Sequence, residues 1–274
     1  MYDDGPAGRD RIAPIDIQPT ADRHSGEIED SIDTAELVAR ALERRATAAQ
    51  KVIGLSTIAP RARSELMNRA VNFMLALVAL IVLAPVMLVV ALAIRLSSPG
   101  PVINAQTRVG IDRRRRRADA IFDRRHSDHG GLVFTIYKFR SMRVDAETKG
   151  AVWALPNDPR VTPIGKRLRQ LRLDELPQLY NVLKGDMNIV GPRPERPSIF
   201  ARLREDISDY PLRQRTKPGL TGWAQVNQAY DANMDDVRSK VRYDLEYIQR
   251  QSLAEDLKIM LKTVPVVLFR RGGW

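Results

Sequence analysis

The stretch AVNFMLALVALIVLAPVMLVVALAI, Ala70–Ile94, carries no charged side chain, and Asn72 is its only strongly polar residue. Its apolar residues surround the helical projection instead of forming one stripe, which is not expected of a soluble surface helix. A straight helix of this length measures roughly 37 Å, enough to cross a bilayer core of about 30 Å. The segment lies too deep in the chain, and is too long, for a cleavable signal peptide. The sequence therefore predicts a membrane segment.

Two features of this segment favour re-entry over crossing. Pro85 lies just past its centre, where proline removes a backbone hydrogen bond and kinks or breaks a helix. Both flanks are cationic: Arg61, Arg63 and Arg69 precede the segment, and Arg95, Arg108 and the run Arg113–Arg117 follow it. Because the positive-inside bias keeps such flanks in the cytoplasm, we expect a helix-break-helix anchor that enters and leaves by the same face. A kinked helix that crosses the bilayer is the alternative.

Composition narrows the possible chemistry. The 274 residues include no cysteine, which excludes disulfides, cysteine-ligated zinc and cysteine nucleophiles. Only three histidines occur, so histidine acid–base catalysis is not expected. The net charge is +11, but residues 1–60 hold seven Lys/Arg and eleven Asp/Glu, a net charge of −4, which leaves +15 on residues 61–274. Such a balance indicates an anionic partner, which is a nucleotide, a nucleic acid or lipid headgroups.

The chain divides into three regions. Residues 1–60 are expected to be a mobile polar tail, residues 61–100 the membrane anchor, and residues 101–274 a domain interrupted by an Arg-rich insertion at 112–131. The β-branched and aromatic run Leu132–Phe139 predicts a strand, and the amphipathic C-terminal segment predicts a surface helix. We therefore expect an α+β fold, in which a mainly helical domain has a small sheet and surface amphipathic helices.

The adjacent carboxylates Asp174 and Glu175 are the strongest candidates for chemistry. Seven cations surround them in sequence: Arg160, Lys166, Arg167, Arg169, Arg172, Arg193 and Arg196. The cations can hold an anionic phosphate, while the carboxylates supply a nucleophile, a base or ligands for a hard cation. A purely structural alternative makes Asp174 a helix N-cap and Glu175 a first-turn acid.

Local patterns place this pair. Thr162-Pro163 predicts a helix start, and after a break at Arg172–Leu173 we expect Asp174 to open a second helix. There the positive end of the helix dipole would keep its carboxylate ionised, as a nucleophile or a magnesium ligand must be. Farther on, two prolines restrict the backbone around Arg193, so its guanidinium can be held ready to bind phosphate in a bidentate manner.

Four ordered motifs point to a family. They are KFRSM (Lys138–Met142), LDELPQLYNVLKGDM (Leu173–Met187), VGPRPE (Val190–Glu195) and KPGLTGWAQVN (Lys217–Asn227). Following a proline-interrupted membrane segment and an SPGPV turn, they resemble the bacterial sugar transferase family, the monotopic polyprenyl-phosphate phosphoglycosyl transferases. The likeness runs from about Arg63 to Val264, and the chain is similar to the family's small members with an added N-terminal tail.

The resemblance implies transfer of a sugar 1-phosphate from a UDP-sugar to undecaprenyl phosphate, with release of UMP, as the first membrane step of exopolysaccharide or other glycoconjugate synthesis. It implies that Asp174 is the nucleophile of an aspartyl phosphosugar intermediate, and that Glu175 assists. It also implies Mg²⁺ as cofactor, with Asp174 and Glu175 as its ligands. The substrate-binding residues that it implies are Lys138, Arg140, Arg169, Arg193 and Lys217.

The implied location is the bacterial inner membrane, with the catalytic domain on the cytoplasmic face and in contact with membrane lipids. No nucleic-acid partner is expected, and a homo-oligomer is left open. Two alternatives remain. A membrane-tethered binder of nucleic acid or anionic lipid would need aromatic residues among its cations, and Arg113–Arg117 contains none. An inactive scaffold of a polysaccharide pathway would not require Asp174.

Overall fold

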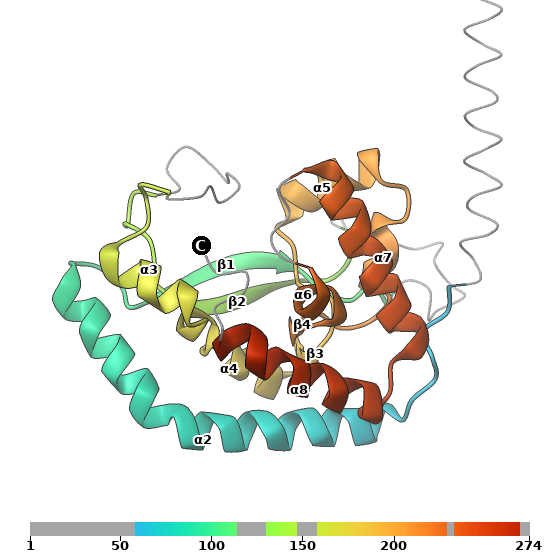
Figure 1. The fold of residues 1–274 in the computed structure, drawn as a ribbon, viewed down its shortest axis with the longest axis horizontal. Coiled ribbons are helices and arrows are strands. Elements are labelled where there is room, and N and C mark those ends of the chain that lie inside the picture. Colours follow the sequence, from blue (N-terminus) through green and yellow to red (C-terminus); the bar gives the residue numbers. More distant parts are fainter. Residues whose placement is uncertain (1–57, 114–129, 147–157, 229–232, 269–274) are drawn as a thin grey trace, which may run out of the picture. The chain divides into compact units, whose positions relative to one another are not determined.

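The structure, a computed structural model, describes residues 58–113, 130–146, 158–228 and 233–268. Most of the expected N-terminal tail and of the 112–131 insertion lies outside these residues. The described elements run α2, β1, β2, α3, the 3₁₀ helix η2, α4, β3, α5, the 3₁₀ helix η3, β4, α6, α7 and α8. Helices and two small sheets occur together, which confirms the α+β prediction at this level (Figure 1).

Helix α2, Glu65–Ser97, contains the predicted membrane segment. It begins at Ser64, whose hydroxyl accepts a hydrogen bond from the Met67 amide. Among the described residues it is the one helix long and apolar enough to cross a membrane. Its apolar surface is largely uncovered, with Ile81, Leu88 and Val89 each about two-thirds or more exposed. Exposure of this kind fits a helix that contacts lipid.

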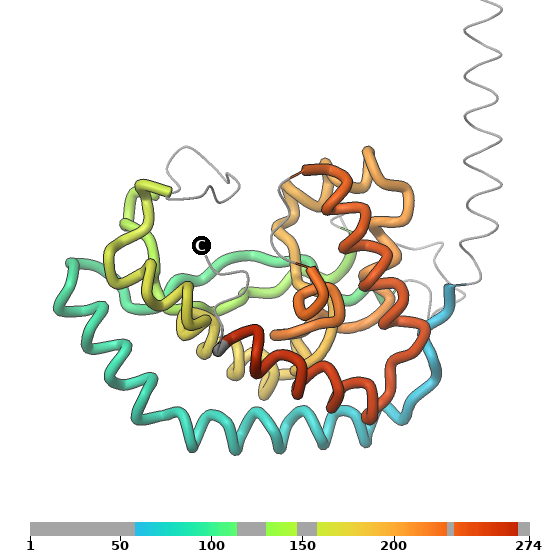
Figure 2. The backbone as a smooth tube through the Cα atoms, viewed as in Figure 1, coloured from blue at the N-terminus to red at the C-terminus, as the bar shows by residue number. Residues whose placement is uncertain are grey.

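The expected break at Pro85 is wrong, because α2 is one continuous helix through the proline. Figure 2 shows that the helix instead bends near its middle. Proline removes one hydrogen bond and pushes away the carbonyl of the preceding turn, and the helix can continue on either side of the resulting kink. Helix α2 is therefore a bent helix and not two separate helices.

The elements that follow α2 in the chain hold this helix along its length (Figure 1). In the N-terminal half, Arg69 donates hydrogen bonds to the carbonyls of Val182 and Leu183 at the end of α4. Asn72, the polar exception of the membrane segment, accepts a hydrogen bond of 2.6 Å from the Ile189 amide. At the other end, Val90 and Ile94 pack in one apolar cluster with Phe139 and Leu168.

Strands β1 (Ile103–Val109) and β2 (Val133–Phe139) form an antiparallel ladder. The prediction of a strand at Leu132–Phe139 is thereby confirmed to within one residue. Helix α4 (Gln178–Lys184) packs against β2 through buried Asn181, whose side chain accepts from the Tyr137 amide and donates to the Thr135 carbonyl. Satisfying two backbone groups of β2 in this way fixes the helix against the strand.

The segment carrying the acidic pair departs from the predicted helix start. Helix α3 (Pro163–Gln170) does begin as expected, since the Thr162 hydroxyl accepts from the Gly165 amide. The backbone then takes a left-handed conformation at Arg172, with a φ of 56°, and α3 does not continue. Asp174 lies in the short 3₁₀ helix η2 (Leu173–Glu175), not at the start of α4. The first α-helical turn begins only after Pro177, so the dipole argument for Asp174 does not apply.

The remaining elements form the largest core. They are β3 (Asn188–Val190), α5 (Pro197–Asp206), η3 (Tyr210–Arg215), β4 (Gly219–Thr221), α6 (Trp223–Asn227), α7 (Met234–Arg250) and α8 (Leu253–Leu268). Strands β3 and β4 pair in parallel. Phe200, Tyr210, Tyr247 and Ile248 are fully buried between these elements. Burial of aromatic side chains on this scale supports the GPRP loop, residues 191–194, which follows β3.

Candidate active site

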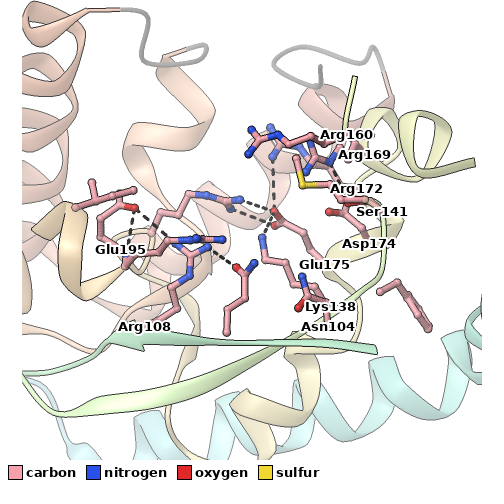
Figure 3. Close-up of a pocket in the computed structure, with 16 residues that line it drawn as sticks. Asn104, Arg108, Lys138, Ser141, Arg160, Arg169, Arg172, Asp174, Glu175 and Glu195 are labelled. Atoms are coloured by element: carbon pink, nitrogen blue, oxygen red, sulfur yellow. Dashed lines mark hydrogen bonds and ion pairs between the residues drawn. The ribbon is translucent and has the colours of Figure 1, made fainter. Parts of the chain in front are cut away.

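A polar cavity of about 220 Å³ lies where the β1–β2 sheet meets η2 and the GPRP loop (Figure 3). Five of the seven cations singled out around the acidic pair line it: Arg160, Arg169, Arg172, Arg193 and Arg196. Asp174 and Glu175 line it as well. The predicted acidic pair in a basic field therefore exists in three dimensions. Lys166 and Arg167 are exposed on α3 and do not line the cavity.

Glu175 is bound by three cations. Arg193 donates from both terminal nitrogens, at 2.5 Å to Oε1 and 3.2 Å to Oε2. Lys138 Nζ lies 3.3 Å from Oε1, and Arg172 lies 3.9 Å from the same oxygen. Burial by itself would raise the pKa of the Glu175 carboxyl, but Arg193 and Lys138 outweigh it and hold the pKa well below its usual value. Glu175 is thus a permanent anion that organises the cations.

The neighbouring carboxylate of Asp174 lacks such partners within the described residues, and its pKa is shifted in the opposite direction. Its side chain is buried to the same degree, yet it accepts no hydrogen bond and forms no ion pair with any residue that the structure describes. Burial and the negative charge of Glu175 raise the pKa of the Asp174 carboxyl, although Lys138 and Arg169 act against the increase. The carboxylate lines the cavity without a partner in the described part of the chain, and a raised pKa makes its oxygen more basic. Such a group is suited to react or to bind a cation.

The sheet contributes one wall through side-chain alternation. Asn104, Gln106 and Arg108 occupy alternate positions of β1 and all line the cavity, and the register places Lys138 of β2 opposite Asn104. Burial is the largest effect on Lys138 and lowers its pKa to about 8. Glu175 raises this pKa, but Arg193 acts against that increase. Lys138 is therefore a cation whose charge depends on pH near neutrality.

The wall of the cavity that α3 forms depends on close packing of this helix against the end of β2. A Cβ atom on Gly165 would lie 1.9 Å from the Ser141 carbonyl oxygen, so only glycine lets α3 approach the end of β2 this closely. One helical turn later, Arg169 Nε donates to Ser141 Oγ at 3.0 Å. Arg160 is held by Asp158 at 2.6 Å. The hydrogen bond from Arg160 is the largest cause that lowers the pKa of Asp158, to about 2.

A buried ion pair between Arg213 and Asp244 holds the backbone of Arg193 in place. Arg213 of η3, fully buried, donates from Nε to Asp244 of α7 at 2.6 Å and from Nη1 to the Tyr210 hydroxyl. Its remaining nitrogen, Nη2, donates to the backbone carbonyl of Arg193 at 3.0 Å. The prolines limit the freedom of the GPRP loop, and Arg213 ties that loop to the main core. Sequence reasoning missed Arg213 and Asp244, because 31 residues separate them.

Arg108 and Glu195 form a second charged pair on the opposite side of the cavity (Figure 3). Arg108 Nη1 lies 3.5 Å from Glu195 Oε1, and Lys240 approaches the other oxygen at 4.0 Å. Burial would raise the pKa of Glu195, but Lys240 and Arg108 lower it. This pair was also missed. The VGPRPE motif contains Glu195, and its position two residues after Arg193 was the available signal.

Two predicted substrate-binding residues lie elsewhere. Arg140 is buried and donates to the carbonyls of Ser98 and Pro99, which follow α2, so it connects the end of α2 to the end of β2 and does not line the cavity. Lys217 lines a different cavity, near the N-terminal end of α2. Lys138, Arg169 and Arg193 are brought together as expected.

The expected magnesium site fits Asp174 better than Glu175. No group of three His, Cys, Asp or Glu side chains that could hold a metal occurs among the described residues. Mg²⁺ is, however, commonly held by one or two carboxylates, with water and substrate phosphate completing its shell. Asp174 offers a carboxylate of this kind. Both oxygens of Glu175 already accept from cations, so Glu175 would have to exchange contacts to bind a metal.

Known proteins are similar to this chain over the region that contains the cavity. A family model described as bacterial sugar transferase matches residues 63–270. The chain is 40% identical over 219 residues to the UDP-N-acetylgalactosamine-undecaprenyl-phosphate N-acetylgalactosaminephosphotransferase of Aeromonas hydrophila, covering 80% of this chain and 48% of that protein. It is 42% identical over 203 residues to the UDP-glucose:undecaprenyl-phosphate glucose-1-phosphate transferase of Escherichia coli K12, covering 73% of this chain and 40% of that protein.

A third relative is similar over nearly its whole length. The exopolysaccharide production protein PSS of Rhizobium leguminosarum is 38% identical over 214 residues, covering 76% of this chain and 98% of that protein. The chain thus spans less than half the length of the two relatives above but almost all of this one.

Proposed function

This chain belongs to the bacterial sugar transferase family, and we propose that it transfers a sugar 1-phosphate from a UDP-sugar to undecaprenyl phosphate, with release of UMP. The observation that carries the proposal is the contrast between the two adjacent carboxylates. Glu175 is neutralised by three cations, whereas Asp174 has no partner among the described residues. A site that only bound phosphate would have no use for a buried, unpaired acid. The relatives named above are undecaprenyl-phosphate sugar phosphotransferases or an exopolysaccharide production protein.

The chemistry proceeds in two displacements at one phosphorus. An Asp174 carboxylate oxygen attacks the phosphorus attached to the sugar, and the bond from that phosphorus to the oxygen of UMP breaks. UMP leaves with the bonding electron pair. A phosphate oxygen of the lipid acceptor then attacks the same phosphorus, and the bond to Asp174 breaks, which regenerates the free carboxylate. The product is a polyprenyl diphosphate sugar.

The surrounding cations have a defined task in this scheme. The developing charge on the transferring phosphoryl group must be neutralised, and Arg169, Arg193 and Lys138 lie around the carboxylates to do so. Bound Mg²⁺ would add charge neutralisation at the diphosphate, with Asp174 as its protein ligand. Glu175 keeps Arg193 and Lys138 in place while the pocket is empty.

Both ends of α2 contact the same domain, which supports the re-entrant topology. Arg69 and Asn72 bind α4 and β3, while Ser98, which follows the other end, is bound by Arg140. Since one domain cannot hold both ends from opposite sides of a bilayer, the two ends lie on one face. We assign that face to the cytoplasmic side of the inner membrane, because the domain must meet a cytosolic UDP-sugar. The pocket then lies where a water-soluble donor meets a lipid phosphate.

The direct test is a panel of UDP-sugars incubated with the purified protein and undecaprenyl phosphate, with UMP release as the readout. We expect release with one or a few of the sugars, and loss of essentially all release in the variant Asp174→Asn. EDTA should abolish the activity and added Mg²⁺ restore it. An Asp174→Asn variant with wild-type turnover would exclude the covalent scheme, and no release from any UDP-sugar would contradict the proposed function.

A further inference from the structure

An apolar groove lies on the other side of η2 from the catalytic pocket. It has a volume of about 350 Å³, and its walls are mainly aliphatic side chains of η2, β3, β4, α6 and α8. Asp174 lines only the catalytic pocket, and Leu173 and Leu176 line only the groove. Arg172 and Glu175 line both. One short 3₁₀ helix therefore separates a polar cavity from an apolar one, and charged residues stand at their shared boundary.

The groove is continuous with the surface that holds the membrane helix. Leu173 and Leu176 pack in the same cluster as Val90 and Ile94 of α2. Groove residue Leu220 packs in the cluster that contains Ala76 of α2. Apolar contacts thus connect the buried face of α2 with the groove at the edge of the catalytic pocket.

The outer wall of the groove is the C-terminal half of α8. Thr263, Val266 and Val267 line it, and the Thr263 hydroxyl is hydrogen-bonded to the Thr221 hydroxyl at 2.8 Å. Because these two hydroxyls satisfy each other, this wall behaves as an apolar surface. A bound molecule would need no hydrogen-bonding groups here.

We propose that this groove holds the first isoprene units of the polyprenyl acceptor, and that it sets the acceptor phosphate beside Arg172 at the entrance to the catalytic pocket. The proposal rests on the proposed function. At about 30 Å³ per heavy atom, the groove has room for roughly a dozen atoms, or two to three isoprene units. An occupant with an anionic head and a single long apolar tail matches both the charged residues at the boundary and the apolar contacts with α2.

Filling the groove tests this assignment. Val266→Trp adds bulk to the wall without touching the catalytic pocket, and Val264→Trp makes the same change on the exposed side of α8 as a matched control. Each methylene removed from an apolar site is worth roughly a factor of four in affinity. Displacing two carbons should therefore raise the KM for the acceptor by about fifteenfold, and Val264→Trp should leave it unchanged.

The two half-reactions separate this inference from the proposed function. With UDP-sugar alone, Val266→Trp should release one equivalent of UMP per enzyme at the wild-type rate, because its donor site is intact. With acceptors, wild type should prefer farnesyl phosphate, which has three isoprene units, over dimethylallyl phosphate, which has one, and Val266→Trp should lose most of this preference.

Three outcomes would overturn the assignment. The first is an unchanged acceptor KM in Val266→Trp, and the second is an equal increase of this KM in Val264→Trp. The third is loss of the one equivalent of UMP released without acceptor, both in Val266→Trp and in a second groove variant, Val267→Trp. The last result would mean that the groove residues serve only the fold. If wild type itself released no UMP from any UDP-sugar, the proposed function would fail, which is a different result.

Discussion

Replacing each member of the acidic pair by its amide should have opposite effects on stability. In Glu175→Gln the side chain keeps its shape and loses its charge, which leaves Arg193, Lys138 and Arg172 around a neutral group. The three ion pairs that this substitution removes have N–O distances of 2.5, 3.3 and 3.9 Å. Breaking one side of a fully buried ion pair costs about 3–5 kcal/mol, and a hydrogen bond to a charged group contributes about 1.5–3 kcal/mol.

The cations are 17–29% exposed, so solvent screens part of this interaction. We therefore expect Glu175→Gln to lower the free energy of unfolding by about 2–3 kcal/mol, which corresponds to a decrease in Tm of roughly 4–12 °C for a domain of this size. Tryptophan fluorescence during thermal unfolding in detergent micelles measures this directly.

Asp174→Asn should not destabilise the protein. The pKa of Asp174 is raised in the folded state, mainly by burial, so at neutral pH its ionised form disfavours folding and a neutral amide should be tolerated or should raise the Tm. The same substitution should abolish turnover. Equal losses of Tm in Asp174→Asn and Glu175→Gln would refute the electrostatic contrast, because Asp174 would then be held by favourable contacts.

Further predictions concern the cations near the cavity, the pH dependence and the topology of α2. Arg193→Ala should lower activity by at least about tenfold, from loss of a charge-assisted contact worth about 1.5–3 kcal/mol, and Arg193→Lys should recover part of it. If Arg193→Ala gave the same donor titration as wild type, the GPRP loop would have only a structural role. Arg140→Ala should instead lower the Tm, because the connection between the ends of α2 and β2 is lost. UMP release should fall at low pH as Asp174 takes up a proton, above the usual aspartate range, and fall again above about pH 8 as Lys138 loses its proton. Lys138→Arg should move the alkaline decrease upward, and a rate that still rose at pH 9 would contradict the role of Lys138. A cysteine placed at Ser25, in a chain without native cysteine, should stay unlabelled by impermeant maleimide in sealed spheroplasts, whereas labelling would show a crossing helix.

The sequence revealed the acidic pair but not the division of roles within it. Asp174 and Glu175 are adjacent, so any local pattern treats them alike. Their different surroundings come from tertiary contacts: Lys138 arrives from β2, 37 residues away, and Arg193 from a loop 18 residues away. The helix dipole argument failed because the backbone is left-handed at Arg172 and the acidic pair lies in a 3₁₀ turn, not at the start of an α-helix.

Where the other residues lie depends on tertiary contacts. The family resemblance implied a substrate-binding role for Arg140, and the structure places its side chain against the carbonyls that follow α2, one residue after β2 ends at Phe139. Strand β1 escaped prediction because Asn104, Gln106 and Arg108 give it a polar face, which lines the cavity. Asn72 looked like an exception in the membrane segment, and its role became visible only from its hydrogen bond to β3.

The central claim is that Asp174 becomes covalently bonded to the sugar phosphate, and the mass of the intact protein after mixing with a UDP-sugar tests it most directly. Without acceptor, wild type should gain the mass of one sugar phosphate as one equivalent of UMP appears, and peptide mapping should place the addition on Asp174. Adding undecaprenyl phosphate should remove it. Asp174→Asn should show no mass change. UMP release by wild type without any adduct, or an adduct that persists in Asp174→Asn, would contradict the account.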